Sequence, residues 1–211
     1  MSKKKVGWKK SFVVGTVAAS LGLGFWASKT FYEVKDVIDG DTFVTKELQF
    51  IRLESIDAPE LDGCLGKEAK NELTKLIANK KVFIKVVYTD ARYNRLVGSV
   101  YTLQGNVEET MLRKGLATFR GDKDRKELLE ASAYARNNNI GVNSAVCTQM
   151  ENLKNPKCNI KGNTTSEKKF YRLPNCGKYS NTKIQLHLGD KWFCTEKEAL
   201  AAGFTKSSDC P

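Results

Sequence analysis

Short apolar runs in the first half of the chain predict a series of β-strands separated by turns. The runs are rich in Val, Ile, Phe and Thr, and Asp39-Gly40 and Lys46-Glu47 interrupt them as turns. They cover residues 31–37, 42–53, 82–88 and 96–103, the last closed by a Gly105-Asn106 turn. The pattern predicts a strand meander, extended by two later strands.

Helical spacing of apolar residues marks three further segments. Residues 66–77 carry a stripe of Ala69, Leu73, Leu76 and Ile77, and residues 107–114 and 124–138 predict two more helices. Gly115 follows the second helix, where a left-handed residue is favoured. Three strands, a helix, two strands and two helices fit a small closed barrel, because closure removes exposed strand edges. The predicted fold class is α+β, a five-stranded OB-type β-barrel with three helices.

The first 29 residues have the pattern of an export signal. Five lysines within the first ten residues precede an uncharged stretch at 11–28, rich in Val, Ala, Leu and Gly. This stretch is also just long enough to span a bilayer, and the lysines predict that the N-terminus stays in the cytoplasm. A retained anchor and a cleaved signal are the alternatives. We expect the anchor, with an extracytoplasmic chain behind it; cleavage would give a secreted protein.

The cysteines and the distribution of charge indicate the compartment of the protein and its domain boundaries. Six cysteines fit an oxidising compartment, and none has the C-x-x-C spacing of zinc or redox motifs. The formal net charge of +11 lies at the two ends, because residues 30–150 are balanced and residues 151–211 carry +5. A high charge alone is therefore weak evidence for nucleic-acid binding. We expect a domain at 30–150, a linker at 151–157 and a small disulfide-stapled module at 158–211.

Three short charged segments beside the apolar strands carry the candidate chemistry. They are residues 38–42, 51–60 and 90–96, and each alone also fits an ordinary turn or loop. Together they contain what phosphodiester hydrolysis needs: charge stabilisation on the phosphoryl oxygens, an activated water and a stabilised leaving oxygen.

Each of these tasks can be assigned to a residue type in the three segments. Asp41 and Asp57 suit a hard divalent cation, with a backbone carbonyl and waters completing its shell. Arginines offer bidentate forks for a phosphate, and Glu60 remains as a base or water-orienting group. The single histidine, His187, lies far away in the tail, so histidine-based nuclease chemistry is excluded.

In order and spacing, the three segments resemble the signature segments of the thermonucleases, the staphylococcal nuclease-like family. The resemblance rests on the string VIDGDT at 37–42, the block RLESIDAPE at 52–60, and Asp90 with Tyr93-x-Arg95, and it covers about residues 32–147. It implies an OB barrel with three helices, calcium dependence, and cleavage of DNA and RNA that leaves 3′-phosphates.

Carried over by position, the resemblance gives each candidate residue a role. The calcium ligands would be Asp41, Asp57 and the carbonyl of Ala58, and Asp39 would support the metal without touching it. The catalytic residues would be Arg52, Glu60 and Arg95, and Tyr93 would contact the substrate. Extracytoplasmic relatives often carry a cysteine at both of two further positions, which implies that Cys64 pairs with Cys147.

The chain departs from the family pattern at positions that leave the catalytic groups in place. Ala58 replaces a threonine, although a carbonyl ligand survives that change. Asn94 stands where glycine is usual, and Asn is the mildest substitute if φ is positive there. No equivalent of the base-stacking tyrosine occurs near Phe119, and Val142 stands where a tryptophan often closes the last helix.

The tail resembles a small cysteine-bearing module that follows some exported bacterial nucleases. The similarity includes segments 160–163, 171–174 and 192–204, but Arg172 replaces an expected histidine. The four tail cysteines with His187 allow two disulfides or a zinc site, and we expect the disulfides. Its charge of +5 leads us to expect that the module raises nucleic-acid affinity without adding chemistry.

Three functions compete for this sequence. We expect a calcium-dependent endonuclease acting on DNA and RNA, monomeric, membrane-anchored and without an implied protein partner. The first alternative is a catalytically inactive OB module that binds nucleic-acid strands, and the second is an anchored surface protein whose barrel is a spacer. An inactive copy should lack at least one of the five main residues, and all five are present: Asp41, Arg52, Asp57, Glu60 and Arg95.

Overall fold

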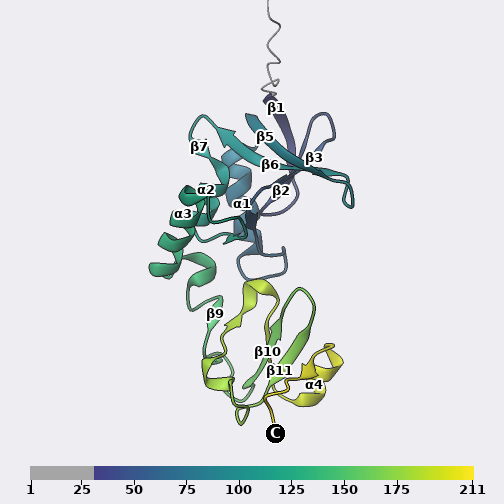
Figure 1. The fold of residues 1–211 in the computed structure, drawn as a ribbon, viewed down its shortest axis with the longest axis vertical. Coiled ribbons are helices and arrows are strands. Elements are labelled where there is room, and N and C mark those ends of the chain that lie inside the picture. The colour runs from purple at the N-terminus through teal and green to yellow at the C-terminus, as the bar shows by residue number, and fades with distance from the viewer. Residues whose placement is uncertain (1–30) are drawn as a thin grey trace, which may run out of the picture.

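The structure is a computed structural model that describes residues 31–211, so the signal or anchor expected at residues 1–29 lies outside the described residues. Two units follow each other along the longest axis of the molecule, with the cysteine-rich module at the C-terminal end (Figure 1). Within residues 31–211, no helix is both long enough and apolar enough to cross a membrane.

A closed barrel forms the first unit. Its strands are β1 Phe31–Val37, β2 Thr42–Thr45, β3 Phe50–Leu53, β5 Lys81–Asp90 and β6 Arg95–Thr102, with a short β7 Gly105–Asn106 at the edge. The hydrogen-bonded order is β3-β2-β1-β5-β6-β7, and parallel pairing of β3 with β6 closes the ring. The predicted five-stranded barrel is confirmed, and the expected turn at Lys46-Glu47 divides the run 42–53 into two strands.

A bulge gives the barrel part of its curvature. The register of β5 against β6 shifts between Val86 and Tyr88, and Gly98 of β6 lies opposite Val86. A Cβ at Gly98 would lie 2.6 Å from the carbonyl oxygen of Lys85, so a side chain does not fit there. Glycine therefore permits the close approach that the bent strand requires.

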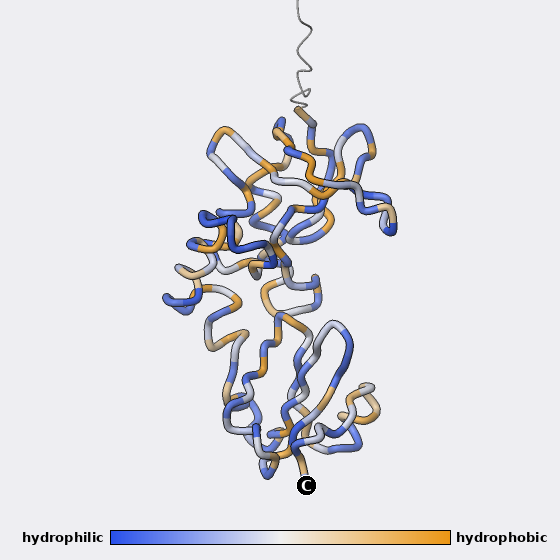
Figure 2. Tube along the Cα trace, viewed as in Figure 1, coloured by the Kyte–Doolittle hydropathy of each residue, from blue (hydrophilic) through white to orange (hydrophobic). Residues whose placement is uncertain are grey.

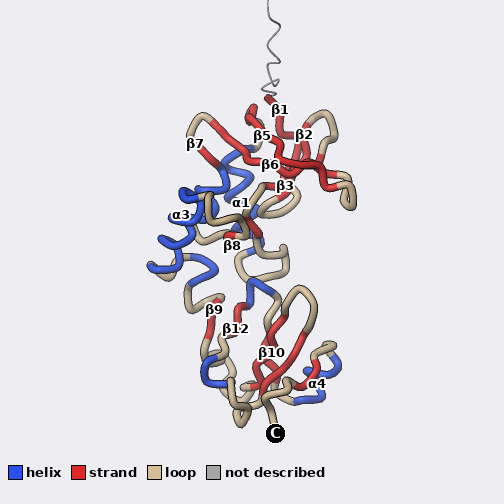
Figure 3. Tube along the Cα trace, in the orientation of Figure 1, coloured by secondary structure: helices blue, strands red, loops and turns tan. Residues whose placement is uncertain are grey.

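All three predicted helices are present, with ends within two residues of the prediction. They are α1 Gly66–Ile77, α2 Val107–Arg113 and α3 Lys126–Asn137, and α2 and α3 lie to one side of the strands (Figure 1 and Figure 3). The Asn106 side chain caps α2 by accepting a hydrogen bond from the Glu109 backbone N–H at 2.7 Å. Gly115 follows α2 with φ of +62°, the left-handed conformation expected after a helix.

Apolar side chains from the strands and helices meet in one core. The alternation of apolar and polar positions along the chain can be followed in Figure 2. The largest fully buried members are Phe43, Ile51, Leu53, Leu73, Ile77, Val82, Val100, Met111 and Leu112. Burial of this set stabilises the barrel against the helices and fixes the loops that carry the charged segments.

The C-terminal module has a sheet and a core of its own. Its elements are β10 Ile160–Thr164, β11 Lys169–Arg172, η2 Tyr179–Asn181, β13 Lys191–Phe193, α4 Glu196–Ala201 and β14 Thr205–Lys206, with sheet order β13-β10-β11-β14. A small apolar core includes Tyr171, Phe193 and Phe204. The tail cysteines form the disulfides Cys158–Cys194 and Cys176–Cys210, which confirms the disulfides and excludes the four-cysteine zinc site.

The module is packed directly against the segment that follows the helices of the first unit. After η1 Gly141–Asn143, strand β9 Thr148–Gln149 pairs antiparallel with β12 Ile184–Gln185, which leads into η3 Leu186–Leu188. The Leu186 backbone N–H donates to the carbonyl of Cys147 at 2.8 Å, and Trp192 Nε1 donates to Gln149 Oε1 at 2.7 Å. Cys147 itself forms the expected disulfide with Cys64. Residues 151–157, the expected linker, connect β9 with β10.

Candidate active site

A tight turn between β1 and β2 places Asp41 inside the molecule. The Asp41 backbone N–H donates to Asp39 Oδ1 at 2.9 Å, and the Asp41 carbonyl accepts from the Leu53 backbone N–H at 2.8 Å. A Cβ at Gly40 would lie 2.6 Å from the Cβ atoms of Ala58 and Ala69. Glycine thus lets the turn pack against the Ala58 loop, and the Asp39 carboxylate holds the backbone of Asp41.

Arg52 joins two carboxylates at the centre of the site. Its Nη1 is hydrogen-bonded to Asp41 Oδ1, and its Nη2 donates to Asp57 Oδ1 at 2.8 Å. The backbone N–H of Ala58 donates to the second oxygen of Asp41 at 3.0 Å. Four of the residues predicted from the sequence therefore meet within hydrogen-bonding distance.

Arg52 brings the carboxylates of Asp41 and Asp57 together, and carboxylate oxygens are ligands that a divalent cation accepts. Asp41 is 3% exposed, and burial raises its pKa to about 6 against the opposing effect of Arg52. A cation favours the ionised form of such a buried carboxyl, and oxygen ligands suit calcium. Within residues 31–211, however, no three His, Cys, Asp or Glu side chains cluster as a ready-made metal cage. A bound ion would need backbone carbonyls and waters as further ligands.

The loop after the short strand β4, Ile56–Asp57, presents Glu60. Glu60 is exposed, and it lines a cleft together with Asp57 and Ala58. A Cβ at Gly66, the first residue of α1, would lie 1.8 Å from the carbonyl oxygen of Glu60. Any side chain at Gly66 would push this loop away, so α1 fixes the position of Glu60.

Arg95, the first residue of β6, interacts with Asp90 and Tyr93 next to the site. Its guanidinium pairs with Asp90, Nη2 to Oδ2 at 3.1 Å, and lies 4.6 Å from the centre of the Tyr93 ring. Asn94 has φ of +48°, so the condition under which Asn is a mild substitute for glycine is met.

The two predicted phosphate-binding arginines share one face of the barrel. Phe50 pairs with Arg95, and Arg52 pairs with Val97, in the parallel ladder of β3 and β6. Arg52 and Arg95 are therefore diagonal neighbours, about 8 Å apart from strand spacing and rise. This placement would let the two guanidinium groups hold a phosphate between them.

Arg120 is a site residue that the sequence did not reveal. It follows β8 Thr118–Phe119, which pairs with β4 so that Asp57 faces Thr118. Arg120 Nε lies 3.6 Å from Asp57 Oδ2, and its side chain is half exposed. Because both strands have two residues, no alternating pattern could have indicated this pairing.

His187 lies beside the site, and the expectation that its place in the tail keeps it far away is wrong. It lines the same cleft as Asp57 and Glu60, and its Nδ1 is buried without a partner among residues 31–211. Burial, and secondarily the guanidinium of Arg120, lower the pKa of His187 to about 4. The ring is therefore neutral at neutral pH and adds no positive charge to the cleft.

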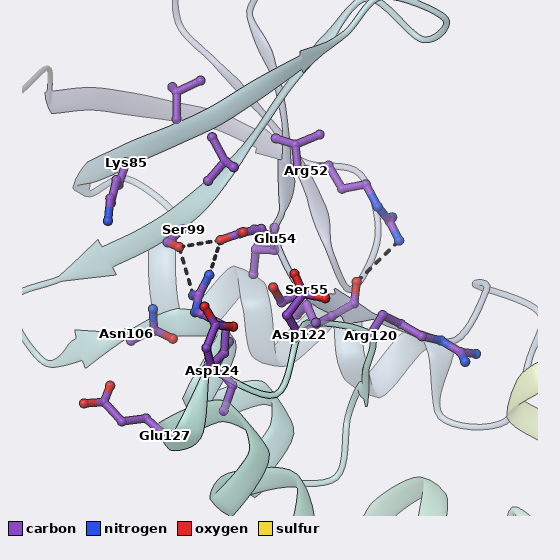
Figure 4. A pocket seen from close by; sticks show the side chains of 18 of the residues that line it. Arg52, Glu54, Ser55, Lys85, Ser99, Asn106, Arg120, Asp122, Asp124 and Glu127 are labelled. Atoms are coloured by element: carbon purple, nitrogen blue, oxygen red, sulfur yellow. Dashed lines mark hydrogen bonds and ion pairs between the residues drawn. The ribbon is translucent and has the colours of Figure 1, made fainter.

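A second hollow, of about 830 Å³, opens beside Arg52 and Arg120 (Figure 4). Inside it, Ser99 Oγ donates to Glu54 Oε2 at 2.9 Å, and Arg125 is ion-paired with the same Glu54 carboxylate. Arg125 immediately precedes α3, so this network joins β6 to the third helix. Its contacts are between elements of the fold, which indicates a structural role.

The comparison with known proteins agrees with this geometry. Residues 50–144 match the family model described as staphylococcal nuclease homologue, a span that includes Arg52, Asp57, Glu60 and Arg95. Over this span, the barrel unit is similar to the staphylococcal nuclease homologues. The matched span ends just after η1, so it does not include the C-terminal module.

Proteins similar to this barrel unit occur in plants and bacteria. The staphylococcal-like nuclease CAN1 of Arabidopsis thaliana is 41% identical over 93 residues, which cover 44% of this chain and 28% of CAN1. An uncharacterized endonuclease of Escherichia coli O157:H7 is 38% identical over 85 residues, covering 38% of this chain and 55% of that protein. The protein ParB of Escherichia coli is 29% identical over 153 residues, covering 64% of this chain and 86% of ParB. The chain thus spans less than a third of the length of the plant relative.

Proposed function

We propose that this chain is a hydrolytic endonuclease that cleaves phosphodiester bonds of DNA and RNA and leaves 3′-phosphates. The observation that carries the proposal is the cluster of Asp41, Arg52 and Asp57, joined by hydrogen bonds beside a cleft that also contains Glu60. The match of residues 50–144 to the staphylococcal nuclease homologue model and similar proteins named as nucleases support it.

Glu60 is proposed as the base that takes a proton from the attacking water. Its side chain makes no hydrogen bond or ion pair among residues 31–211, and it is exposed to the cleft that Asp57 lines. A free carboxylate in that position can reach a water molecule directly. Because the loop is fixed by its contact with Gly66, the carboxylate approaches from a defined side.

Arg52 and Arg95 are proposed to bind the phosphoryl oxygens. Both guanidinium groups are held by carboxylates before substrate arrives, Arg52 by Asp41 and Asp57 and Arg95 by Asp90. Donors that are fixed in advance stabilise charge that develops in the transition state without a further cost of reorganisation. Tyr93, 59% exposed beside Arg95, is proposed to contact the substrate.

We propose calcium as the cofactor, held by Asp41, Asp57 and the backbone carbonyl of Ala58. When bound, the ion neutralises charge on the phosphoryl oxygens. Magnesium should replace it poorly, because a few protein oxygens and waters make a roomy shell, whereas magnesium needs a tight octahedron. Digestion of plasmid with calcium, with magnesium after removal of trace calcium, and with a chelator tests this. Equal rates with the two metals would contradict the calcium assignment.

Substitution of Glu60 tests the proposed base. Glu60→Gln should lower turnover at least roughly hundredfold, because general-base catalysis contributes about 10²- to 10⁴-fold. Glu47→Gln, in the exposed turn between β2 and β3, is the matched control and should leave the rate unchanged. A rate within twofold of wild type for folded Glu60→Gln would disprove the assignment. Strand binding without cleavage by the wild type would favour the inactive binding module.

A second pair of variants tests the phosphate-binding role of Arg95. Arg95→Ala should lower kcat by roughly 10²- to 10³-fold, the usual loss when a transition-state donor is removed. Arg92→Ala is the matched control, because Arg92 lies over the same Tyr93 ring at 5.5 Å but makes no ion pair among the described residues. Equal effects of the two substitutions would show that Arg95 has no special role.

We also propose that the chain acts outside the cytoplasm as a monomer, anchored by its N-terminal segment, without a protein partner. The three disulfides support an oxidising location. Cell fractionation with an antibody against residues 158–211 separates the alternatives, because an anchored chain sediments with membranes and a cleaved one enters the medium.

A further inference from the structure

A cleft of about 1070 Å³ lies between the nuclease unit and the C-terminal module. Asp57, Ala58 and Glu60 line one wall, so the proposed catalytic residues open into it. Residues 164–166 and 186–191 of the module line the opposite wall, and Lys154 lies at the connection between the units. The proposed active site is therefore enclosed on one side by a part of the chain outside the family match.

The two walls are held together by covalent and hydrogen-bonded contacts. Cys64, four residues after Glu60, is joined by its disulfide to Cys147. Cys147 then accepts a hydrogen bond from the backbone of Leu186 in the module wall, next to the pairing of β9 with β12. The module wall thus has a fixed position relative to the catalytic loop.

Asp190 fixes the two loops of the module wall to each other. Its Oδ1 accepts from the Thr164 backbone N–H at 2.7 Å, and its Oδ2 accepts from Asn163 Nδ2 and the Gln185 backbone N–H, both at 2.9 Å. The carboxylate is buried and its partners all belong to the module. Lys191, the next residue, is therefore presented from a rigid frame rather than from a free loop.

The side chains of the two walls differ in charge. Asp57, Glu60 and Asp62 give the nuclease wall three carboxylates, next to the single guanidinium of Arg120. The module side offers the exposed Lys154 and Lys191. Neither lysine makes an ion pair or a side-chain hydrogen bond among residues 31–211. Cations that are free, exposed and fixed beside a phosphodiesterase site have the chemistry that binds a phosphate backbone.

We propose that Lys154 and Lys191 form a subsite for a backbone phosphate of the polynucleotide, next to the one being cleaved. This assignment rests on the proposed nuclease function and adds a binding role for the module. The volume of the cleft is near the upper end for small-molecule sites, which suits a short stretch of one strand. The lysines draw the strand to the module side, away from the carboxylates.

Substrates of two lengths test the subsite. A dinucleotide has only the scissile phosphate, whereas a single-stranded 20-mer also has neighbouring phosphates that can reach Lys154 and Lys191. Lys154→Ala/Lys191→Ala should raise KM for the 20-mer roughly tenfold at low salt and leave kcat and the dinucleotide KM unchanged. The control Lys157→Ala/Lys197→Ala removes two exposed lysines that do not line the cleft, and should change neither KM.

Binding without cleavage keeps the test independent of catalysis. Fluorescence anisotropy of a labelled 20-mer, with chelator present, gives Kd as a function of salt. Loss of two phosphate contacts to a single strand should lower the slope of log Kd against log salt by about 1.4. Equal KM changes for both substrates, or an unchanged salt slope, would overturn the subsite. Failure of the wild type to cleave either substrate would instead refute the nuclease function, and the salt slope would still decide the subsite.

Discussion

Replacing Glu108 with glutamine is expected to stabilise the folded protein at neutral and alkaline pH. Glu108 lies in the first turn of α2 and is 0% exposed. Its Oε1 accepts a hydrogen bond from the Val100 backbone N–H at 2.9 Å, but its Oε2 has no partner among the described residues. Burial is the largest cause that raises the pKa of Glu108, from 4.5 to about 8.

The sign and size of the effect follow from that shift. Below pH 4.5 the carboxyl is protonated in both the folded and the unfolded chain, so glutamine changes little. Between pH 4.5 and 8 the folded chain retains a proton that the unfolded chain has lost, and the stability of the wild type falls as pH rises. Above pH 8 the wild type has lost up to about 5 kcal/mol of unfolding free energy through Glu108, at about 1.4 kcal/mol per pKa unit. The glutamine side chain keeps an acceptor for the Val100 N–H and does not ionise.

Urea unfolding of wild type and Glu108→Gln at pH 5, 6, 7, 8 and 9 measures this difference. The gap in unfolding free energy should widen with pH at similar m-values and then level off. Glu109→Gln is the control, because Glu109 pairs with Arg113 on the helix surface, a contact worth only about 0.2–0.5 kcal/mol. A gap that stays constant from pH 5 to 9 would refute the reasoning.

Three further substitutions should destabilise the fold. Cys64→Ser/Cys147→Ser opens an 83-residue loop and should cost about 4.5 kcal/mol by chain entropy, measured by urea unfolding; a loss below about 1 kcal/mol would contradict this estimate. Gly141→Ala places a Cβ 2.1 Å from the Gly115 carbonyl oxygen at φ of +60°, and should cost about 2–5 kcal/mol; an unchanged Tm would contradict the clash. Asn94→Ala should cost about 1–2 kcal/mol in thermal melts because φ is +48°, whereas Asn94→Gly should not destabilise.

Elements with a long apolar pattern were the predictable part of the fold. Helix α1 was predicted at its observed bounds, because its buried stripe of Ala69, Leu73 and Ile77 repeats over three turns. The predicted C-terminal end of α2 was one residue late, next to the left-handed Gly115. The two-residue strands β4, β8, β9 and β12 could not be predicted, because so short a segment has no periodicity and depends on its partner.

The residues of the candidate site were also predictable only where they lie in or next to long strands or signature segments. Asp41, Arg52, Asp57 and Ala58 were predictable, since they lie in signature segments joined by the barrel strands, and the structure brings them together. Arg120 was missed because β8 places it, and His187 was misjudged because β12 returns the tail to the cleft. Sequence patterns report which face of an element is buried, but not which unit will cover it.

The Cys64–Cys147 bridge also determines how the chain responds to mechanical force. If the two ends of the protein are pulled apart, the bridge carries the load past the loop between the cysteines, which contains α1, β5, β6, α2 and α3. That loop has a contour length of about 270–300 Å at full extension. In an optical trap, the oxidised chain should extend by that much less than the Cys64→Ser/Cys147→Ser variant, which keeps the two disulfides of the module. Tension on the termini of the oxidised protein therefore cannot extend β5, β6 or the three helices, whereas β1, β2 and β3 precede Cys64 and remain open to the load.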